Sequence, residues 1–455
     1  MKFGGTSVQD AERIGNVARI AVARREERPV IVTSAMSGVT NELVRLADMA
    51  RRGDRSFLDD GIGPLQRRHL AVAEQLAPHD STLREVLELQ LRELRVLLRG
   101  ICLTARATPQ ALDALLGCGE LLAQELVVAA IRVLGGQAVA VDAREVVITD
   151  DSFGAARPDL PRTARRCGDR VVPWIEQGVI PVLGGYVGAT PDGVPTTLGR
   201  GGSDLSASVL GLGLSATSIE IWTDVDGLMS ADPRVEPNAR LLSHVSFLEA
   251  AELAGFGAKV LHPASIDPAV RAGIPVRVCN SLFPDRPGTW IDAEGSAVAD
   301  GIRAVVSRSG VSLLSLIAPG ATRNPEFLIT LLRDEVPSEL GVLAVVPGPV
   351  GVDLLIANGP ELTLAEDRLA KHGRLECRRG LGMVAVIGEG IGADAKTWIR
   401  VATVAAPWTP LRIATGPRGA SLHLVCDETA LSELVRALHQ SLVRTDVPAN
   451  SQSRP

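Results

Sequence analysis

The stretch Thr196-Thr197-Leu198-Gly199-Arg200-Gly201-Gly202-Ser203-Asp204-Leu205-Ser206-Ala207 decides how this 455-residue chain is interpreted. It combines three glycines, an arginine and a carboxylate in a tight turn that leads into a helix-like run of small residues. Glycine lets main-chain N–H groups approach a ligand closely, and a helix N-terminus adds partial positive charge. The stretch therefore fits an anion-binding loop, although a plain structural turn has the same composition.

Two more glycine-containing segments favour a binding loop: Lys2-Phe3-Gly4-Gly5-Thr6-Ser7 and Trp222-Thr223-Asp224-Val225-Asp226-Gly227. The chain contains no GxxxxGK[ST] sequence, so it is not a P-loop enzyme. Phosphoryl transfer requires the protein mainly to position two anions and to neutralise charge on the moving phosphoryl group. Lysines, Mg²⁺ and main-chain amides do this. The three segments together predict a phosphoryl-transfer enzyme.

Lysine usage singles out two positions. Only four of the 47 basic residues are lysine, and two of these, Lys2 and Lys259, lie inside glycine-containing segments. A compact ammonium on a flexible stem is not interchangeable with a planar guanidinium. We therefore interpret Lys2 and Lys259 as positions where a point charge is needed.

The positions of the histidines indicate which kind of group acts as the nucleophile. Of seven, only His244 and His262 lie near the glycine segments, and His262 is interpreted as structural. A hydroxyl nucleophile would require a nearby general base, whereas a carboxylate, with a pKa of roughly 4, is already ionised at pH 7. The pattern favours a kinase that forms an acyl phosphate.

Composition excludes several classes of protein. A net charge of −6 and an aromatic content of 3% argue against nucleic-acid binding. No apolar run reaches the roughly 18–20 residues of a membrane span, and we expect no signal peptide. The six cysteines are scattered without a CxxC pair, which argues against zinc and is typical of a reducing cytoplasm. We expect a cytoplasmic globular protein of two or three domains.

Strand and helix patterns alternate over roughly the first 290 residues. Strand patterns lie at 31–33, 138–141, 179–183 and 219–222. Helical patterns lie at 41–99, 121–134 and 205–212. Ser246 and Glu249 have capping-box spacing and predict a helix through Leu253. This alternation predicts an α/β fold with a mostly parallel sheet and helices on both faces.

The pattern changes after Trp290, where shorter strand patterns such as 342–346 and 383–387 alternate with turns and two helical stretches. We place a domain boundary near residue 297. The predicted domains are 1–297, which carries the glycine segments, and 298–446. The polar segment 447–455 is predicted to be a disordered tail.

Six segments, in order, resemble those of the aspartate kinases in the amino-acid kinase superfamily. They are KFGGTSV (Lys2–Val8), SAMSGVTN (Ser34–Asn41), GE (Gly119–Glu120), TTLGRGGSD (Thr196–Asp204), WTDVDG…DPRV (Trp222–Val235) and FGAKVLHP (Phe256–Pro263). The chain looks most like the monofunctional, lysine-sensitive branch. The resemblance implies a three-layer αβα kinase domain followed by tandem ACT-like α/β units. In the family these units pair into a homodimer and bind a feedback amino acid, here lysine or threonine.

The resemblance also implies an activity, ATP-dependent phosphorylation of the L-aspartate β-carboxylate to 4-phospho-L-aspartate. Lys2 and Asp204 would be catalytic, and Asp204 would also organise Mg²⁺. Glu120 would receive the substrate ammonium and Arg200 its α-carboxylate. The pocket would be completed by Ser37, Thr40, Gly201 and Ser203. ATP would be held by Gly4, Gly5, Thr6, Ser7, Thr223, Asp224, Gly227, Arg234 and Lys259.

Two departures from the family pattern generate further expectations. The family carries an apolar strand before KFGG, whereas only Met1 precedes Lys2 here. Either the true start lies further upstream or the first strand is truncated, and we then expect Lys2 beside a mobile, charged terminus. In the first ACT-like unit, the region 321–328 differs from the family's effector turn. The serine and glutamate that would receive an effector after Asp353 are missing. We therefore hypothesise weak or absent inhibition by lysine.

Two alternative functions stay open at this point. One is a kinase for another small acid such as glutamate, which the complete TTLGRGGSD segment disfavours. The other is a catalytically silent, amino-acid-binding regulatory subunit, which the two retained lysines disfavour.

Overall fold

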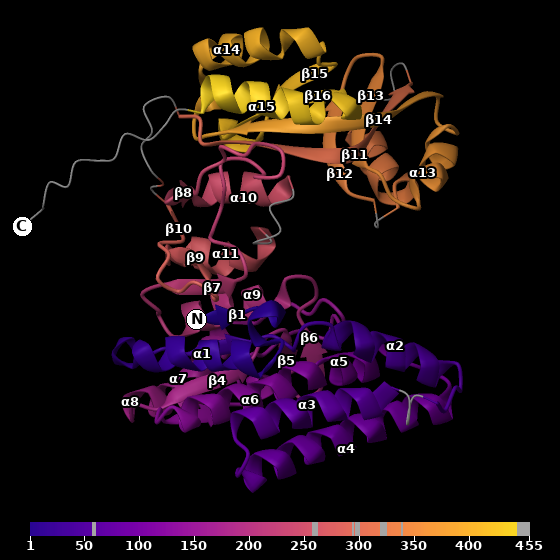
Figure 1. The fold of residues 1–455 in the computed structure, drawn as a ribbon. Helices are drawn as coiled ribbons and strands as arrows, with labels where there is room; N and C mark the ends of the chain where they lie inside the picture. Colours follow the sequence, from indigo (N-terminus) through magenta and orange to yellow (C-terminus); the bar gives the residue numbers. More distant parts are fainter. Residues whose placement is uncertain are drawn as a thin grey trace, which may run out of the picture. The chain divides into compact units, whose positions relative to one another are not determined.

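The computed structural model describes residues 1–56, 61–256, 263–293, 295, 301–318, 325–337 and 340–443. These residues form two compact units (Figure 1). The first comprises Met1–Leu228, Leu241–Ala254 and the described part of Ala258–Ser296. The second comprises Met229–Arg240 and the described parts of Gly255–Gly257 and Ala297–Pro455.

These units differ from the domains expected from the sequence at two segments, since Met229–Arg240 and the described part of Gly255–Gly257 group with the second unit rather than with the first. The proposed boundary at residue 297 and the proposed tail at 447–455 lie outside the described residues. The domain limits 1–297 and 298–446 therefore stay predictions.

The first unit is built on an eight-stranded sheet. In spatial order its strands are β3 (Ala138–Ala140), β4 (Ile180–Gly184), β2 (Ile31–Thr33), β1 (Lys2–Phe3), β7 (Ile219–Thr223), β9 (Val276–Asn280), β10 (Thr289–Asp292) and β8 (His244–Ser246). The strands from β3 to β9 run parallel, while β10 is antiparallel to β9 and parallel to β8. The predicted strands at 31–33, 138–141, 179–183 and 219–222 are thus confirmed.

Two groups of helices pack on this sheet or on one another and complete a three-layer α/β unit. The first group is α1 (Ala11–Ala23), α2 (Val39–Arg51), α3 (Ile62–Leu76), α4 (Ser81–Thr104), α5 (Pro109–Leu116) and α6 (Cys118–Val133). The second group is α7 (Leu160–Arg170), α8 (Val172–Glu176), α9 (Gly202–Gly213) and α11 (Pro263–Ala272). A hairpin of β5 (Val187–Ala189) and β6 (Pro195–Thr197) leads into α9.

The predicted capping box is observed at α10 (Phe247–Gly255). The Ser246 N–H donates to Glu249 Oε2 at 2.9 Å, and the Glu249 N–H donates back to Ser246 Oγ at 3.2 Å. The pair satisfies two N–H groups at the helix start, as this sequence spacing requires.

The first strand corrects one expectation. β1 is only two residues long, but it lies between β2 and β7 and pairs with both. The Met1 amino group donates to the Val30 carbonyl at 2.8 Å. Lys2 therefore lies in the middle of the sheet, and the expectation that it would sit beside a mobile terminus is wrong.

The helical run Pro109–Val133 is the one stretch in the described residues that is long and apolar enough to cross a membrane. It comprises α5 and α6, and 78% of its most apolar window is buried inside the structure. Such burial is that of a core helix in a globular unit.

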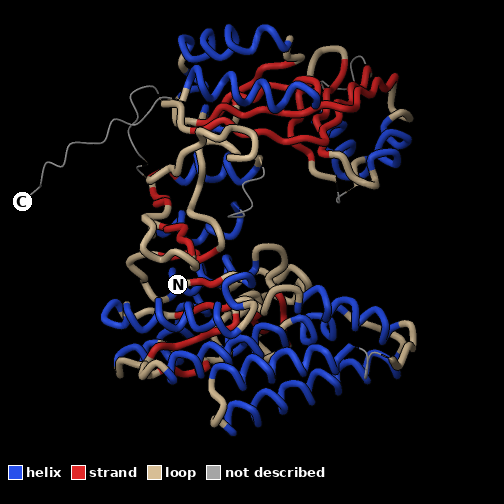
Figure 2. The backbone as a smooth tube through the Cα atoms, viewed as in Figure 1, coloured by secondary structure: helices blue, strands red, loops and turns tan. Residues whose placement is uncertain are grey.

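The second unit is built on a six-stranded antiparallel sheet (Figure 2). Its strands in spatial order are β12 (Val342–Pro347), β13 (Gly351–Ala357), β11 (Ala304–Ile317), β14 (Arg374–Ile387), β16 (Ser421–Asp427) and β15 (Arg412–Thr415). Its helices are α12 (Pro325–Thr330), α13 (Leu362–Leu369), α14 (Ala395–Ala405) and α15 (Leu431–Leu442). One apolar core lies under α13 and another under α14 and α15, as expected for two ACT-like units that share the long strands β11 and β14.

Burial on α6 provides a test of this fold. Leu126 is fully buried, whereas Val133 on the same helix is 60% exposed. Leu126→Ala should lower the free energy of unfolding by about 2–5 kcal/mol, because it removes packed atoms and leaves a cavity. The matched control Val133→Ala should change it by less than about 0.5 kcal/mol. Urea unfolding followed by circular dichroism measures both, and equal effects would contradict the assigned face of α6.

Candidate active site

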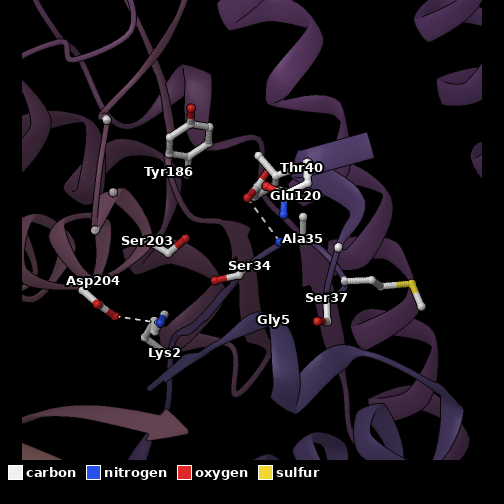
Figure 3. Close-up of a pocket in the computed structure, with 16 residues that line it drawn as sticks. Lys2, Gly5, Ser34, Ala35, Ser37, Thr40, Glu120, Tyr186, Ser203 and Asp204 are labelled. Carbon is white, nitrogen blue, oxygen red and sulfur yellow. Dashed lines mark hydrogen bonds and ion pairs between the residues drawn. The ribbon is translucent and has the colours of Figure 1, made fainter. Parts of the chain in front are cut away.

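A cavity of about 380 Å³ opens where β1 and β2 end. Its walls come from Lys2 and Gly5, from the turn at 34–41, from Glu120 and from the loop at 199–204 (Figure 3). In parallel α/β sheets, ligands bind at the carboxyl ends of the strands, because the loops that follow them converge there. With Tyr186, which also lines it, segments from five separate parts of the sequence meet at one cavity.

An ion pair that is largely, but not fully, buried lies on one wall of this cavity. Lys2 Nζ on β1 is 2.7 Å from Asp204 Oδ1 in the first turn of α9, and the two side chains are 12% and 13% exposed. The pair therefore presents a fixed ammonium and a carboxylate to whatever occupies the cavity (Figure 3).

Two glycines allow the walls to approach each other. A Cβ on Gly5 would lie 2.9 Å from the Ala35 carbonyl oxygen, which is closer than real Cβ contacts come. Gly201 adopts a left-handed conformation, with φ of 70°, at the N-cap of α9. The Gly202 N–H donates to the Gly199 carbonyl at 3.0 Å, and no side chain caps this helix, so the N–H groups that follow in its first turn are available for an anion.

Glu120 on α6 is the most perturbed acid in the cavity. It is 3% exposed, and its Oε1 accepts a hydrogen bond from the Ala35 N–H at 3.2 Å. Its Oε2 is buried and has no partner among the described residues. Burial raises the pKa of Glu120 to about 8. A carboxyl group held this way is set to receive a cationic group, because an ammonium would supply its missing partner.

Most residues predicted for the amino-acid pocket are brought together here. Ser37, Thr40, Gly201 and Ser203 all line the cavity. Arg200 does not line it, and its side chain is exposed. The structure therefore assembles this set except for its one guanidinium.

Tyr186 lines the cavity but was missed by the sequence analysis. It is the only tyrosine in the chain and adopts a left-handed conformation with φ of 68°, which is rare for a bulky residue. A Cβ on Gly202 would meet its ring at 2.7 Å. Burial raises the pKa of Tyr186, while a hydrogen bond with the Thr197 side chain lowers it. Its position directly after a strand and Gly184-Gly185 was the available signal.

The predicted nucleotide residues are only partly placed. The segment from Gly4 to Ser7 forms a tight turn, in which the Ser7 N–H donates to the Gly4 carbonyl at 2.9 Å. Thr223 ends β7, and Gly227 has φ of 143°. These residues belong to the first unit, as does Asp224, which is exposed.

Arg234 belongs to the second unit, and its exposed side chain pairs with Asp232 at 2.6 Å. Lys259 and His262 lie outside the described residues. Among the residues that the structure describes, no group of three or more His, Cys, Asp or Glu side chains could hold a metal ion. A metal here would need ligands from a bound molecule.

The fold and the cavity define a class of protein, an amino acid kinase joined to a second α/β unit. The sequence profile of the amino acid kinase family matches residues 1–280. The chain is 32% identical over 451 residues to the lysine-sensitive aspartokinase 3 of Escherichia coli, covering 97% of this chain and 98% of that protein. The chain belongs to the aspartokinase family.

Other comparisons agree with this assignment. The chloroplastic aspartokinase 2 of Arabidopsis thaliana is 31% identical over 469 residues, with 98% of this chain and 84% of the relative covered. The structure of E. coli aspartokinase III with aspartate and ADP superposes with a TM-score of 0.81 at 31% identity, covering 97% of this chain and 99% of that one. The complex of the same enzyme with lysine and aspartate has a TM-score of 0.83 at 32% identity and the same coverage.

The raised pKa of Glu120 predicts how stability depends on pH. Between its usual pKa of 4.5 and its folded-state pKa of about 8, the folded protein keeps a proton that the unfolded chain has released. The contribution of Glu120 to stability therefore falls as pH rises through this window. Without ligand, the melting temperature of Glu120→Gln relative to the unmodified protein should rise from pH 5 to pH 9. Parallel melting profiles for the two proteins would contradict the buried, unpaired carboxyl.

Proposed function

We propose that this chain transfers the γ-phosphoryl group of ATP to the β-carboxylate of L-aspartate, forming 4-phospho-L-aspartate, the first step toward lysine, threonine and methionine. One observation carries this proposal: the unpartnered carboxyl oxygen of Glu120 and the Lys2–Asp204 pair line the same small cavity. A carboxyl that lacks a cation and an ammonium beside a helix N-terminus match the two charged ends of an amino acid.

In this proposal Glu120 binds the substrate ammonium. Ser37, Thr40, Gly201 and Ser203 line the bound aspartate, and Arg200 reaches its α-carboxylate, for which its exposed side chain would have to turn inward. A β-carboxylate oxygen forms the new bond to the γ-phosphorus, the bond to the bridging oxygen breaks, and ADP leaves. The nucleophile is already ionised at neutral pH, so no general base is required.

Lys2 acts on the phosphoryl group. Its ammonium stabilises negative charge as the group moves, and Asp204 holds that ammonium in place. The nucleotide is assigned to Gly4, Gly5, Thr6, Ser7, Thr223, Asp224, Gly227, Arg234 and Lys259.

Mg²⁺ is assigned to Asp204. This fits the donors present, because Mg²⁺ in phosphoryl-transfer enzymes takes one or two carboxylates and completes its shell with phosphate oxygens and water. When bound, the ion neutralises charge on the phosphates.

The test is formation of an acyl phosphate from L-aspartate and MgATP, trapped with hydroxylamine as the hydroxamate. Lys2→Ala should abolish turnover, because nothing else in the described cavity supplies a fixed ammonium. Circular dichroism should show that the variant is folded. Lys371→Ala, in the second unit, is the matched control and should keep full activity. Substantial activity in Lys2→Ala would remove Lys2 from the mechanism, and no turnover by the unmodified protein would favour the regulatory-subunit alternative.

We assign the second unit to regulation and to homodimer formation, and the enzyme to the cytoplasm. Edge strand β12 supports the assignment to homodimer formation, because Val342 and Val346 on it are 40% and 42% exposed. Apolar side chains on an unpaired edge are typical of a surface that another chain covers. Free cysteines throughout the described residues support a reducing compartment.

We further propose that lysine inhibits this enzyme weakly or not at all. The Asp353 carboxylate is ion-paired with Arg412 inside the second unit, so it already has a cation. Asn358 accepts a hydrogen bond from Ser312 Oγ at 2.7 Å, and no acidic residue occurs at 354–359. A lysine effector would thus find no free carboxylate at this position.

The lysine hypothesis is tested by adding L-lysine to the hydroxamate assay. Millimolar lysine should leave the rate unchanged within about twofold, because each factor of ten in affinity needs about 1.4 kcal/mol of interaction that this site lacks. The lysine-sensitive E. coli relative serves as the positive control. Strong inhibition by lysine would refute the hypothesis.

A further inference from the structure

We infer that Asp113 is a positioning residue for the amino-acid pocket, joining the wall that carries Glu120 to the loop at 199–204. The inference rests on the proposed function of this cavity. Asp113 lies on α5, is 2% exposed and does not itself line the cavity. It is therefore not a catalytic residue, and its action must pass through its neighbours.

The Asp113 carboxylate is bound by three donors. Its Oδ2 accepts hydrogen bonds from the Gly154 N–H at 2.9 Å and the Thr197 N–H at 2.8 Å, and its Oδ1 accepts one from Thr197 Oγ1 at 2.8 Å. Charge-assisted bonds of this length are stronger than bonds between neutral groups. One side chain thus ties α5 to two segments that are distant from it in sequence.

Both segments hold the substrate loop. Thr197 is the last residue of β6 and lies two residues before Gly199. A Cβ on Gly199 would lie 3.1 Å from the Gly154 carbonyl oxygen, so Gly154 packs directly against the loop. Asp113 therefore holds the loop at two places, through Thr197, where the chain enters the loop, and through Gly154, which packs against it.

The other wall of the cavity is connected to the same residue. The Gly117 N–H donates to the Asp113 carbonyl at 3.1 Å, and α6, which begins at Cys118, carries Glu120. One short helix, α5, therefore sets the position of the Glu120 carboxyl, which receives the ammonium, and also that of the loop with Gly201 and Ser203. Their separation must match the length of the bound amino acid, and small errors in such positioning weaken binding strongly.

Charge is not what this position requires. No ion pair of Asp113 occurs in the described residues, and all three contacts are hydrogen bonds from N–H or O–H groups. An asparagine can keep both backbone bonds through its carbonyl oxygen, while its NH₂ group donates to Thr197 Oγ1. Asp113→Asn should thus preserve the connection that Asp113→Ala removes.

The experiment measures steady-state kinetics of Asp113→Ala and Asp113→Asn in the full-length protein with the hydroxamate assay. Asp113→Ala should raise the KM for L-aspartate roughly tenfold. The buried donors of Gly154 and Thr197 lose their acceptor, and the loop at 199–204 is then no longer held in the position that binds aspartate. The KM for MgATP should stay within about twofold, and Asp113→Asn should stay within about twofold of the unmodified protein for both substrates. Thr197→Val, which removes only the hydroxyl donor, should also raise the KM for L-aspartate. This variant replaces Asp113→Ala as the test if Asp113→Ala does not fold.

Leu94→Ala is the control for a purely structural defect, because this buried residue of α4 does not line the cavity. It should lower the melting temperature without changing the aspartate KM. The inference is overturned if Asp113→Ala leaves that KM unchanged, raises the MgATP KM equally, or matches Asp113→Asn in its defect. Absence of turnover in the unmodified protein would instead refute the proposed function, so the two failures are distinguishable.

Discussion

The ion pair between Lys2 and Asp204 is the interaction on which the site depends. Lys2 belongs to a strand of only two residues, and that strand is fixed because it pairs with β2 on one side and β7 on the other. Asp204 belongs to the first turn of α9, which can begin there because Gly201 turns the chain through a left-handed conformation. The sheet thus fixes the position of the Lys2 ammonium, helix α9 fixes that of the Asp204 carboxylate, and the cavity forms where the two groups meet.

The cavity combines one satisfied charge pair with one unsatisfied acid. Lys2 and Asp204 compensate each other, so burying them is tolerable. Glu120 has no cation among the described residues, and its raised pKa expresses the free energy needed to ionise it there. A protein that keeps such a group in its core retains a penalty that a cationic ligand removes, and this is why the cavity suits an amino acid better than a neutral molecule.

The second unit is organised around two shared strands. β11 and β14 pair along their length, and one apolar core forms under α13 while another forms under α14 and α15. The segment Met229–Arg240 also packs with this unit, since His439 on α15 lies 2.8 Å from Ser230 Oγ and Arg436 donates to the Val235 carbonyl. Part of the motif assigned to nucleotide binding therefore belongs by packing to the second unit.

The sequence by itself determined the elements whose signals are local. β-branched runs such as Ile31–Thr33 predicted strands, and Ser246 and Glu249 predicted a helix start. The glycine segments predicted several residues that line the cavity, among them Lys2, Gly5 and Gly201. These signals suffice because strand propensity, capping and glycine's backbone freedom act within a few residues.

Only the tertiary structure decided how distant groups meet. It placed Tyr186 in the cavity, left Arg200 exposed, buried Glu120 without a cation and bound Asp113 to Thr197. None of these follows from the local pattern, because each depends on packing between segments far apart in the chain. A tyrosine after two glycines or an aspartate in a short helix looks ordinary until the fold shows what lies against it.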